Sequence, residues 1–334
     1  MRRSIVFATS AFAPLAELAR QAEAAGFDRI WTTEFPDRDA LIRAMVVGAA
    51  TTRIGLASGI AYSFTRHPLA LAAAALDVHE ATGGRFTLGL GTATRAMRAR
   101  WYGDGETRPV AQLGEIVALL RAAWASEGGR FAHRGEFYRC TVDGLALAAR
   151  SAALPPLAVF GSGLNAGMLR AAAGCCDGLA LHPLAAGPVY LDKTVAPILA
   201  AAPGRGAALW VITSVDADEA QARLRAKRAL AFFFSTPGYE GAAAGESWED
   251  APARIRARFP AVGADWTALA DEVPEEMVDQ LTLAGTPASV RAQLPALEAR
   301  LAAAGVDELV FQTGVEDADE FTAICQGIIE HCRP

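Results

Sequence analysis

The sequence predicts an α/β fold of the (β/α)8 TIM-barrel class, with insertions. Short apolar stretches with β-branched residues alternate with Ala- and Leu-rich stretches of helical length through most of the 334 residues. This alternation predicts parallel strands joined by helices, and eight such units favour a closed barrel over an open sheet. In chain order the predicted strands are Ser4–Thr9, Arg29–Thr33, Ile54–Ile60, Arg85–Leu90, Pro156–Phe160, Gly178–His182, Ala207–Ser214 and Glu308–Thr313.

Helices are predicted between these strands, and several carry end signals. Pro68 lies in the first turn of one helix, where its missing N–H has no cost. Asp216 is a suitable N-cap for the helix that it begins, and Gly26 and Gly305 end two others. The predicted helices are Pro14–Ala25, Arg38–Thr51, Pro68–His79, Val110–Trp124, Leu164–Gly174, Val189–Ala202, Asp216–Phe234, Pro287–Ala304 and Asp317–His331.

Two segments interrupt the alternation. Residues 128–143 alternate in the manner of a short hairpin, whereas residues 235–275 contain Pro, Gly and Trp without one period. A long irregular stretch inside a compact domain is typical of a lid, a binding insertion or an extra helical pair. We expect a single domain over residues 1–334. Its insertion at about 235–275 is expected to cover the active site, with Trp248 and Trp266 closing the pocket; the alternative is a helical pair packed away from the mouth.

Composition and charge argue against several classes of protein. The formal net charge is −6, which disfavours a nucleic-acid partner. No apolar run is long and uncharged enough to span a bilayer, and Met1 stands so close to the first predicted strand that a signal peptide has no room. The five cysteines form no CxxC pair. We therefore expect no metal site, no disulfide framework and a cytoplasmic location.

Small and hydroxyl residues follow several predicted strands. Ser58 and Gly59 end the third strand, and a Gly-Leu-Gly-Thr run ends the fourth at Thr92. A flat ligand can approach the backbone at such strand ends. Gly161, Ser162 and Gly163 form a glycine-rich turn into a helix, whose free N–H groups suit a phosphate.

His182 ends the sixth predicted strand, at the carboxyl edge of the barrel. It is the best titratable candidate there for proton transfer. The alternative is a histidine that is only hydrogen-bonded within the structure.

A series of motifs in chain order carries a family resemblance. They are EAAGFDRIWTTE (23–34), TTRIGLASGIAYSFTRHP (51–68), GGRFTLGLGT (83–92), LGEIVALLRAAW (113–124), RGEFY (134–138), VFGSG (159–163), AAGCCDGLALHP (172–183), STPGYEG (235–241) and LAGTPASVRAQL (283–294). On these motifs the chain resembles the luciferase-like monooxygenase superfamily, whose (β/α)8 barrels bind flavin or the deazaflavin coenzyme F420. The likeness is strongest to its F420-dependent oxidoreductase branch.

The resemblance implies roles for residues at the ends of the second and third strands. It places a cis peptide at Gly59–Ile60, where the family uses the resulting bulge to support the central ring of the cofactor; the alternative is an ordinary bulge. Glu34 matches an acidic residue of the family, which implies cofactor contact and a catalytic role; the alternative is a solvated capping carboxylate. Phe35 departs from the family pattern, which often has histidine there.

The resemblance also implies where the anionic parts of the cofactor bind. The phosphate falls on the turn of residues 161–163. The loop that holds Thr92 carries no acidic residue between positions 91 and 103, but it carries Arg95, Arg98 and Arg100. These arginines fit the phosphate and acidic tail of F420; the alternative is a set of solvated surface arginines.

Together these expectations define a function. We expect an F420-dependent oxidoreductase that transfers a hydride to or from a small organic substrate, with Glu34 and His182 as catalytic candidates. The first alternative is an FMN-dependent monooxygenase on the same barrel, and the second is a flavin-binding protein without turnover. The expected partners are the substrate and, in a homodimer, a second copy of the chain.

Overall fold

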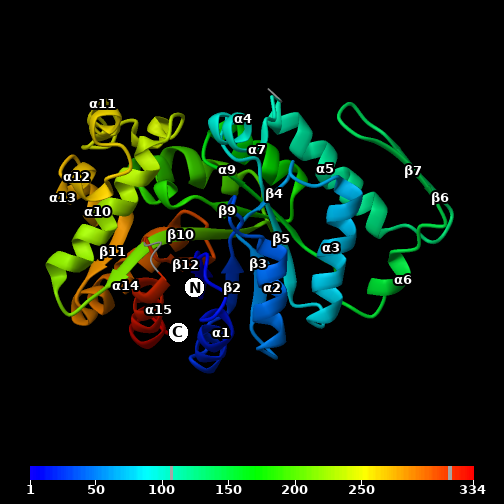
Figure 1. Cartoon of the computed structure of the whole chain (residues 1–334), viewed down its shortest axis with the longest axis horizontal. Helices are drawn as coiled ribbons and strands as arrows, with labels where there is room; N and C mark the ends of the chain where they lie inside the picture. Colours follow the sequence, from blue (N-terminus) through cyan, green and yellow to red (C-terminus); the bar gives the residue numbers. More distant parts are fainter. Residues whose placement is uncertain (106–107, 315–317) are drawn as a thin grey trace.

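The computed structural model describes residues 1–105, 108–314 and 318–334. Its centre is a barrel of parallel strands surrounded by helices (Figure 1). Strand β10 pairs with β9 and with β12, and β12 pairs with β1, so the sheet closes on itself. The predicted (β/α)8 barrel is confirmed. Its strands are β1 (Arg2–Phe7), β2 (Arg29–Thr32), β3 (Gly55–Ser58), β5 (Phe86–Gly91), β8 (Val159–Gly163), β9 (Gly178–Leu181), β10 (Gly206–Val215) and β12 (Glu308–Gln312).

The helices that surround the barrel follow the predicted order. They are α1 (Leu15–Ala24), α2 (Ala40–Ala49), α3 (Pro68–Ala81), α5 (Pro109–Trp124), α7 (Ala166–Cys175), α10 (Glu219–Ser235), α14 (Pro287–Ala303) and α15 (Ala318–His331). The helix expected over residues 189–202 is divided into α8 (Pro188–Tyr190), a π-helical turn at Leu191–Val195 and α9 (Ala196–Ala200). Pro197 has no N–H to continue the regular bonding, which accounts for the turn before it.

The cap expected at Asp216 is wrong. Helix α10 begins later, and Asp218 caps it by accepting from the backbone N–H of Ala220 at 2.9 Å. The Asp216 carboxylate instead pairs with Arg225 at 2.6 Å. Asp218, two residues further along, is equally suited to this role, and no local pattern distinguishes the two aspartates.

Four short elements were not predicted. Helix α4 (Arg95–Tyr102) has no apolar period, and β4 (Ala61–Tyr62) has only two residues. Strand β11 (Thr282–Gly285) pairs with the carboxyl end of β10 outside the closed ring. A four-residue helix, α6 (Ala148–Ser151), follows the hairpin described next. Elements this short leave too little pattern in a sequence to be recognised.

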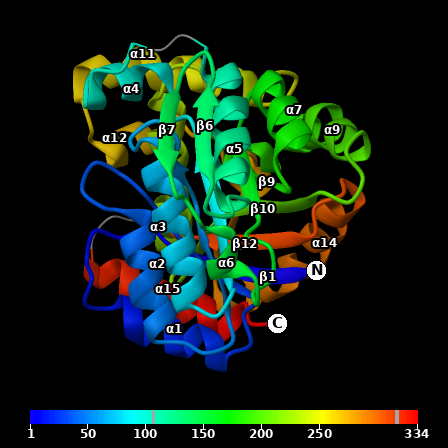
Figure 2. The same ribbon diagram turned by 90° about the vertical axis from the view of Figure 1, so that its right-hand side faces the viewer.

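The predicted hairpin is confirmed as β6 (Arg130–Arg134) and β7 (Arg139–Asp143). It runs beside α5 at the edge of the molecule (Figure 2). Glu115 of α5 fixes its turn, because its carboxylate accepts from the backbone N–H groups of residues 136, 137 and 138 at 2.8–2.9 Å. These bonds lower the pKa of Glu115, although its partial burial acts in the opposite direction.

The insertion folds into a 3-10 turn (Glu240–Ala243) and three helices, which pack beside α10 (Figure 1). The helices are α11 (Ala251–Val262), α12 (Trp266–Ala270) and α13 (Glu275–Leu281). Trp248 is buried and donates to Gln280 at 2.8 Å, while Trp266 packs against the rings of Phe232 and Phe259. Neither tryptophan lines the pocket, so the expectation that they close it is wrong.

The amino end of the barrel is filled. Glu308 begins β12, is fully buried, and accepts from Arg29 at 2.6 Å and from the indole N–H of Trp31 at 2.8 Å. The rings of Trp31 and Trp210 meet inside the barrel at 4.7 Å between centroids. A ligand can therefore enter this barrel only from the carboxyl ends of its strands. No helix in the described part of the chain has the length and apolar character needed to cross a membrane.

Candidate active site

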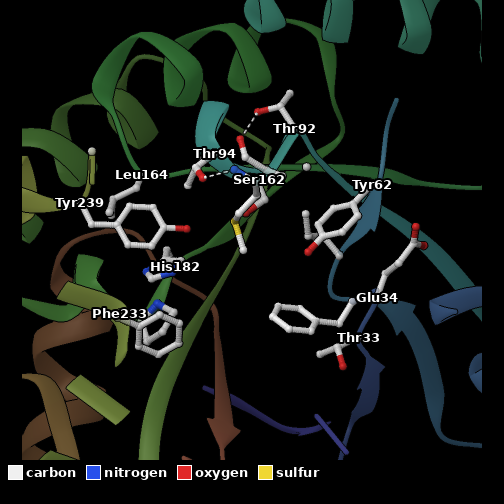
Figure 3. Close-up of a pocket in the computed structure, with 18 of the residues that line it drawn as sticks. Thr33, Glu34, Tyr62, Thr92, Thr94, Ser162, Leu164, His182, Phe233 and Tyr239 are labelled. Atoms are coloured by element: carbon white, nitrogen blue, oxygen red, sulfur yellow. Dashed lines mark hydrogen bonds between the residues drawn. The ribbon is translucent and has the colours of Figure 1, made fainter. Parts of the chain in front are cut away.

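A cavity of about 930 Å³ lies at the carboxyl ends of the barrel strands (Figure 3). Its volume suits a cofactor together with a small substrate. Trp210 forms part of its inner wall, and the rest is formed by strand ends, by the loops that follow them and by residues of helices α4, α5, α7 and α10. Of the predicted site residues, the cavity brings together Glu34, Gly59, Ile60, Thr92, Arg95, Ser162, Gly163 and His182.

The peptide bond between Gly59 and Ile60 is cis, at the position that the resemblance implied. Both residues line the cavity. A Cβ at position 59 would lie 2.8 Å from the ring of Trp210, and one at Gly91 would lie 1.9 Å from Cδ1 of Ile60. Glycine at both positions therefore lets this wall of the cavity pack closely, leaving a surface of backbone and small groups for a flat ring.

Glu34 is a buried member of an ion-pair network. The guanidinium of Arg66 donates to both of its carboxylate oxygens at 2.9 and 3.0 Å, and the hydroxyl of Thr65 donates at 3.1 Å. Arg66 also pairs with Asp39. Burial raises the pKa of Glu34, although Arg66 acts in the opposite direction. These bonds occupy both oxygens, so the carboxylate is suited to holding the loop in place more than to acting as a free base.

Phe35 adds an aromatic wall beside Glu34. The guanidinium of Arg38 lies 4.8 Å from the centre of its ring, and the ring of Trp101 meets it edge-on at 4.9 Å. Arg38 is itself held by Thr33, which accepts from its Nε at 2.9 Å. This part of the cavity therefore supplies packing where the family often supplies a histidine.

The three arginines that follow the fourth barrel strand lie in different environments. Arg95 lines the cavity and has no hydrogen-bond or ion-pair partner within the described residues. Arg98 is buried, where it donates to Asp104 at 3.1 Å and to Gln112 at 2.8 Å. Arg100 is exposed and lies outside the cavity. The expected three-arginine anion site is therefore corrected to Arg95 alone, because Arg98 is already neutralised.

The carboxyl end of β8 leads into α7 at the cavity wall, and residues 161–163, which were expected to form a turn, are the last residues of this strand. Ser162, Gly163, Leu164 and Asn165 line the cavity, and Asn165 caps α7 by accepting from the N–H of Met168 at 2.9 Å. A ten-residue helix that begins here offers unpaired N–H groups and the positive end of its dipole to an anion.

Gly161 does not line the cavity, contrary to expectation. A Cβ at this position would lie 2.6 Å from Cβ of Ala172 and 2.9 Å from Sγ of Cys176. Gly161 thus allows β8 to pack closely on α7. The side chains alternate along a strand, so Gly161 faces the helix, while Phe160 packs inside the barrel and Ser162 lines the cavity.

His182 follows β9 and lies between aromatic rings in the cavity wall (Figure 3). Its Nδ1 accepts from the N–H of Leu184 at 3.2 Å. Phe233 and Tyr239 each lie 4.8 Å from it between ring centres. Burial lowers the pKa of His182 to about 3. The ring is therefore neutral at physiological pH, with its proton on Nε2, and it can donate a hydrogen bond but cannot act as an imidazolium acid.

Two tyrosines that line the cavity were not among the predicted site residues. The hydroxyl groups of Tyr62 and Tyr239 point into the cavity from opposite sides (Figure 3). Burial raises the pKa of both, that of Tyr239 to about 12. Tyr62 stands two residues after Ile60 and Tyr239 lies within STPGYEG, so both belong to motifs that carried the resemblance. Proximity in sequence to those motifs was the available signal.

The closed parallel barrel places a large cavity at the carboxyl ends of its strands, as is typical of TIM-barrel proteins. Residues 3–304 match the family described as luciferase-like monooxygenase. The chain belongs to this family.

Named relatives place the chain near both deazaflavin and flavin proteins. The 5,10-methylenetetrahydromethanopterin reductase of Archaeoglobus fulgidus is 27% identical over 299 residues, which cover 86% of each chain. The coenzyme F420-dependent tetrahydromethanopterin reductase of Methanopyrus kandleri has a similar structure, with a TM-score of 0.78 and 20% identity over 99% of this chain and 97% of that one.

A flavin protein shares the fold as well. The oxygenating constituent of 3,6-diketocamphane monooxygenase from Pseudomonas putida, in complex with FMN, gives a TM-score of 0.67 at 15% identity. The match covers 100% of this chain and 98% of that one. Structural likeness at such identities shows the fold alone, so the cofactor has to be argued from the site.

Proposed function

We propose that the protein is an F420-dependent oxidoreductase that transfers a hydride to or from a small organic substrate. The observation that carries this proposal is Arg95, a cation without a partner in the described residues that lines the same cavity as the N-terminus of α7. The two features together offer more anion recognition than a single phosphate requires. F420 carries a phosphate and an acidic tail, so it uses both.

The residues that line the cavity support this proposal. A Cβ at position 59 or 91 would intrude on this wall, and the glycines there leave it free. When bound, the deazaflavin supplies a carbon that accepts or donates a hydride. Gly59 and Ile60 would support the ring from one side, while the N–H groups of Ser162 and Gly163 would hold the phosphate. Phe35 and Phe233 exclude water from the remaining space.

FMN is the alternative cofactor, and an FMN-dependent monooxygenase is the alternative function. The helix N-terminus serves the phosphate of either cofactor, and a family fold is seen with FMN. A flavin-binding protein without turnover remains the third candidate, because the oxygens of Glu34 are occupied and His182 is neutral.

Titration of the purified protein with each cofactor tests the proposal. Binding of F420 is followed by its fluorescence, and binding of FMN by quenching of its own fluorescence. We expect F420 to bind more tightly than FMN, because only F420 engages Arg95. Tighter binding of FMN, or no binding of F420, would overturn the proposal in favour of the flavin alternatives.

We further propose that the protein works in the cytoplasm as a homodimer. Its five cysteines are all free, as suits a reducing compartment. Helix α2 is apolar on its outer face as well, where Ile42 is 57% exposed and Met45 is 37% exposed. Its one charged residue, Arg43, is buried. A helix that is apolar all round is normally covered, and we expect the second copy to cover it.

A further inference from the structure

Two cysteines stand side by side where helix α7 ends. Cys175 is the last residue of α7, and Cys176 follows it as the cap. Their Sγ atoms share a hydrogen bond at 3.7 Å, and neither residue lines the cavity. Cys175 is half-buried, whereas Cys176 is fully buried. A small reagent from solvent would therefore reach Cys175 first, with the second thiol directly beside it.

The surroundings of Cys175 favour its thiolate, which is the reactive form of a thiol. A hydrogen bond from the neighbouring thiol lowers the pKa of Cys175. The guanidinium groups of Arg121 and Arg205 act in the same direction, whereas burial opposes them. Both arginines pair with Asp177, the residue that follows the two cysteines, at 2.9 and 3.7 Å. The shared hydrogen bond and burial raise the pKa of Cys176, so its thiol keeps its proton.

We propose that Cys175 and Cys176 form a reversible oxidation site, in which hydrogen peroxide converts the two thiols into a disulfide between adjacent residues. The peptide bond between them is trans, which sets their Cα atoms about 3.8 Å apart. This distance is below the usual range for a disulfide, so the bond would be strained and easily reduced. A disulfide of this kind suits regulation more than structural support.

The oxidation takes two steps that balance. The thiolate of Cys175 attacks one oxygen of the peroxide, the O–O bond breaks, and a sulfenic acid and hydroxide form; the proton that Cys175 released turns the hydroxide into water. The thiol of Cys176 then attacks the sulfenic sulfur, and the S–S bond forms as the S–O bond breaks. The hydroxyl group leaves with the Cys176 proton as water. The two thiols lose two electrons, and the peroxide gains them.

The new bond would also act on strand β8, whose carboxyl end lines the cavity. Asp177 makes two hydrogen bonds to Val159 of β8, because its N–H donates to the carbonyl at 2.7 Å and its carboxylate accepts from the N–H at 2.9 Å. Sγ of Cys176 lies against Gly161, where an added Cβ would be 2.9 Å from it. The sulfur atoms have to approach to about 2.05 Å to bond. We therefore expect this shift to loosen β8.

Mass spectrometry of tryptic peptides tests the disulfide on the whole chain. The folded protein is treated with hydrogen peroxide at neutral pH, the peroxide is removed, and the remaining thiols are blocked with iodoacetamide in denaturant. Cleavage after Arg170 and Lys193 releases residues 171–193, which contain both cysteines of the pair and no other. We expect this peptide to lose the mass of two hydrogen atoms and to carry no alkyl group. Dithiothreitol before blocking should restore two alkyl groups.

Cys140 is the internal comparison, because it is also half-buried but stands on strand β7, and the peptide of residues 140–150 contains it alone. It should still be alkylated at a peroxide dose that oxidises half of the pair. In Cys176→Ala the sulfenic acid of Cys175 should persist and react with dimedone, whereas Cys140→Ala should form the disulfide as wild type does. Alkylation of both Cys175 and Cys176 after peroxide overturns the proposal, and so does equally fast oxidation of Cys140.

Hydrogen–deuterium exchange of the reduced and oxidised protein tests the link to β8. We expect the backbone N–H groups of residues 159–163 to exchange at least about fivefold faster after oxidation, and those of β2, across the barrel, to be unchanged. Equal exchange of β8 in the two forms would overturn the link to the cavity. Neither measurement uses a cofactor, so both decide the inference even where the proposed function fails.

Discussion

At the scale of single residues, neighbours with the same side chain have different roles. Arg98 is 1% exposed and shares its charge with Asp104, whereas Arg95 is exposed at the cavity and has no partner in the described chain. Arg95 and Arg98 lie about one turn apart on α4, so one side chain reaches the cavity while the other is buried. The sequence predicted an anion-binding loop, but pairing and burial decide which arginine can bind the anion.

Arg95→Gln should weaken F420 binding by about fivefold to tenfold at low salt, as expected for loss of one charge-assisted hydrogen bond. The salt dependence of binding should also flatten, since exposed charges are screened. Fluorescence titration at several ionic strengths measures both effects. Arg100→Gln is the control, because Arg100 lies outside the cavity. Equal affinities for wild type and Arg95→Gln at low salt would show that Arg95 is only a surface group.

Asn165→Asp should separate phosphate binding from stability. Asp caps a helix as well as Asn does, and its charge favours the helix N-terminus, so the melting temperature should hold or rise. The same charge repels a phosphate nearby and should weaken both F420 and FMN at least tenfold. Asn165→Ser keeps a neutral cap and should bind both cofactors normally. If the Asp variant also binds both normally, the phosphate lies elsewhere.

At the scale of elements, the insertion is a mostly helical segment that contributes only a few consecutive residues to the cavity wall. Only Pro237, Gly238 and Tyr239 of the segment line the cavity, and its large rings pack against α10 and against each other. Most of the segment is helical, and its helices pack on α10. Whether it moves over a bound cofactor stays a prediction.

Trp248→Ala should lower the free energy of unfolding by about 3–5 kcal/mol, the usual cost of emptying a large buried site. Trp248 is 2% exposed, and its ring packs on Phe234. Trp266→Ala should cost less, because Trp266 is only partly buried. Denaturant unfolding measures both losses. Cofactor affinity of the folded variants should not change, and a loss of affinity with intact stability would mean that Trp248 reaches the ligand after all.

At the scale of the whole molecule, the barrel is filled by side chains at the amino ends of its strands and holds a cavity at their carboxyl ends. The buried Glu308 occupies the amino end with Arg29 and Trp31, so the groups that can contact a ligand lie toward the carboxyl end of the barrel. The other feature at this scale is the apolar outer face of α2, where Ile42 and Met45 are exposed and do not contribute to the core of the barrel.

Ile42→Glu should convert the proposed homodimer into a monomer. Position 42 is the third residue of α2, where a glutamate stabilises a helix, so the subunit itself should remain folded. Light scattering after size-exclusion chromatography gives the mass directly. Lys193→Glu, a charge change at a distant exposed position, should leave the mass unchanged. A wild-type monomer would refute the dimer, and a dimeric Ile42→Glu variant would place the interface elsewhere.

The sequence by itself determined the order of strands and helices, because alternation and helix-end residues are local properties. It also indicated that Gly59, Ile60, Ser162 and Gly163 lie at the cavity, since glycines at strand ends carry a local signature. Tertiary structure alone decided that Gly161 packs on α7, that Glu34 is held by Arg66 and that His182 is neutral. Burial, pairing and protonation depend on groups brought together from distant parts of the chain, and no local pattern records them.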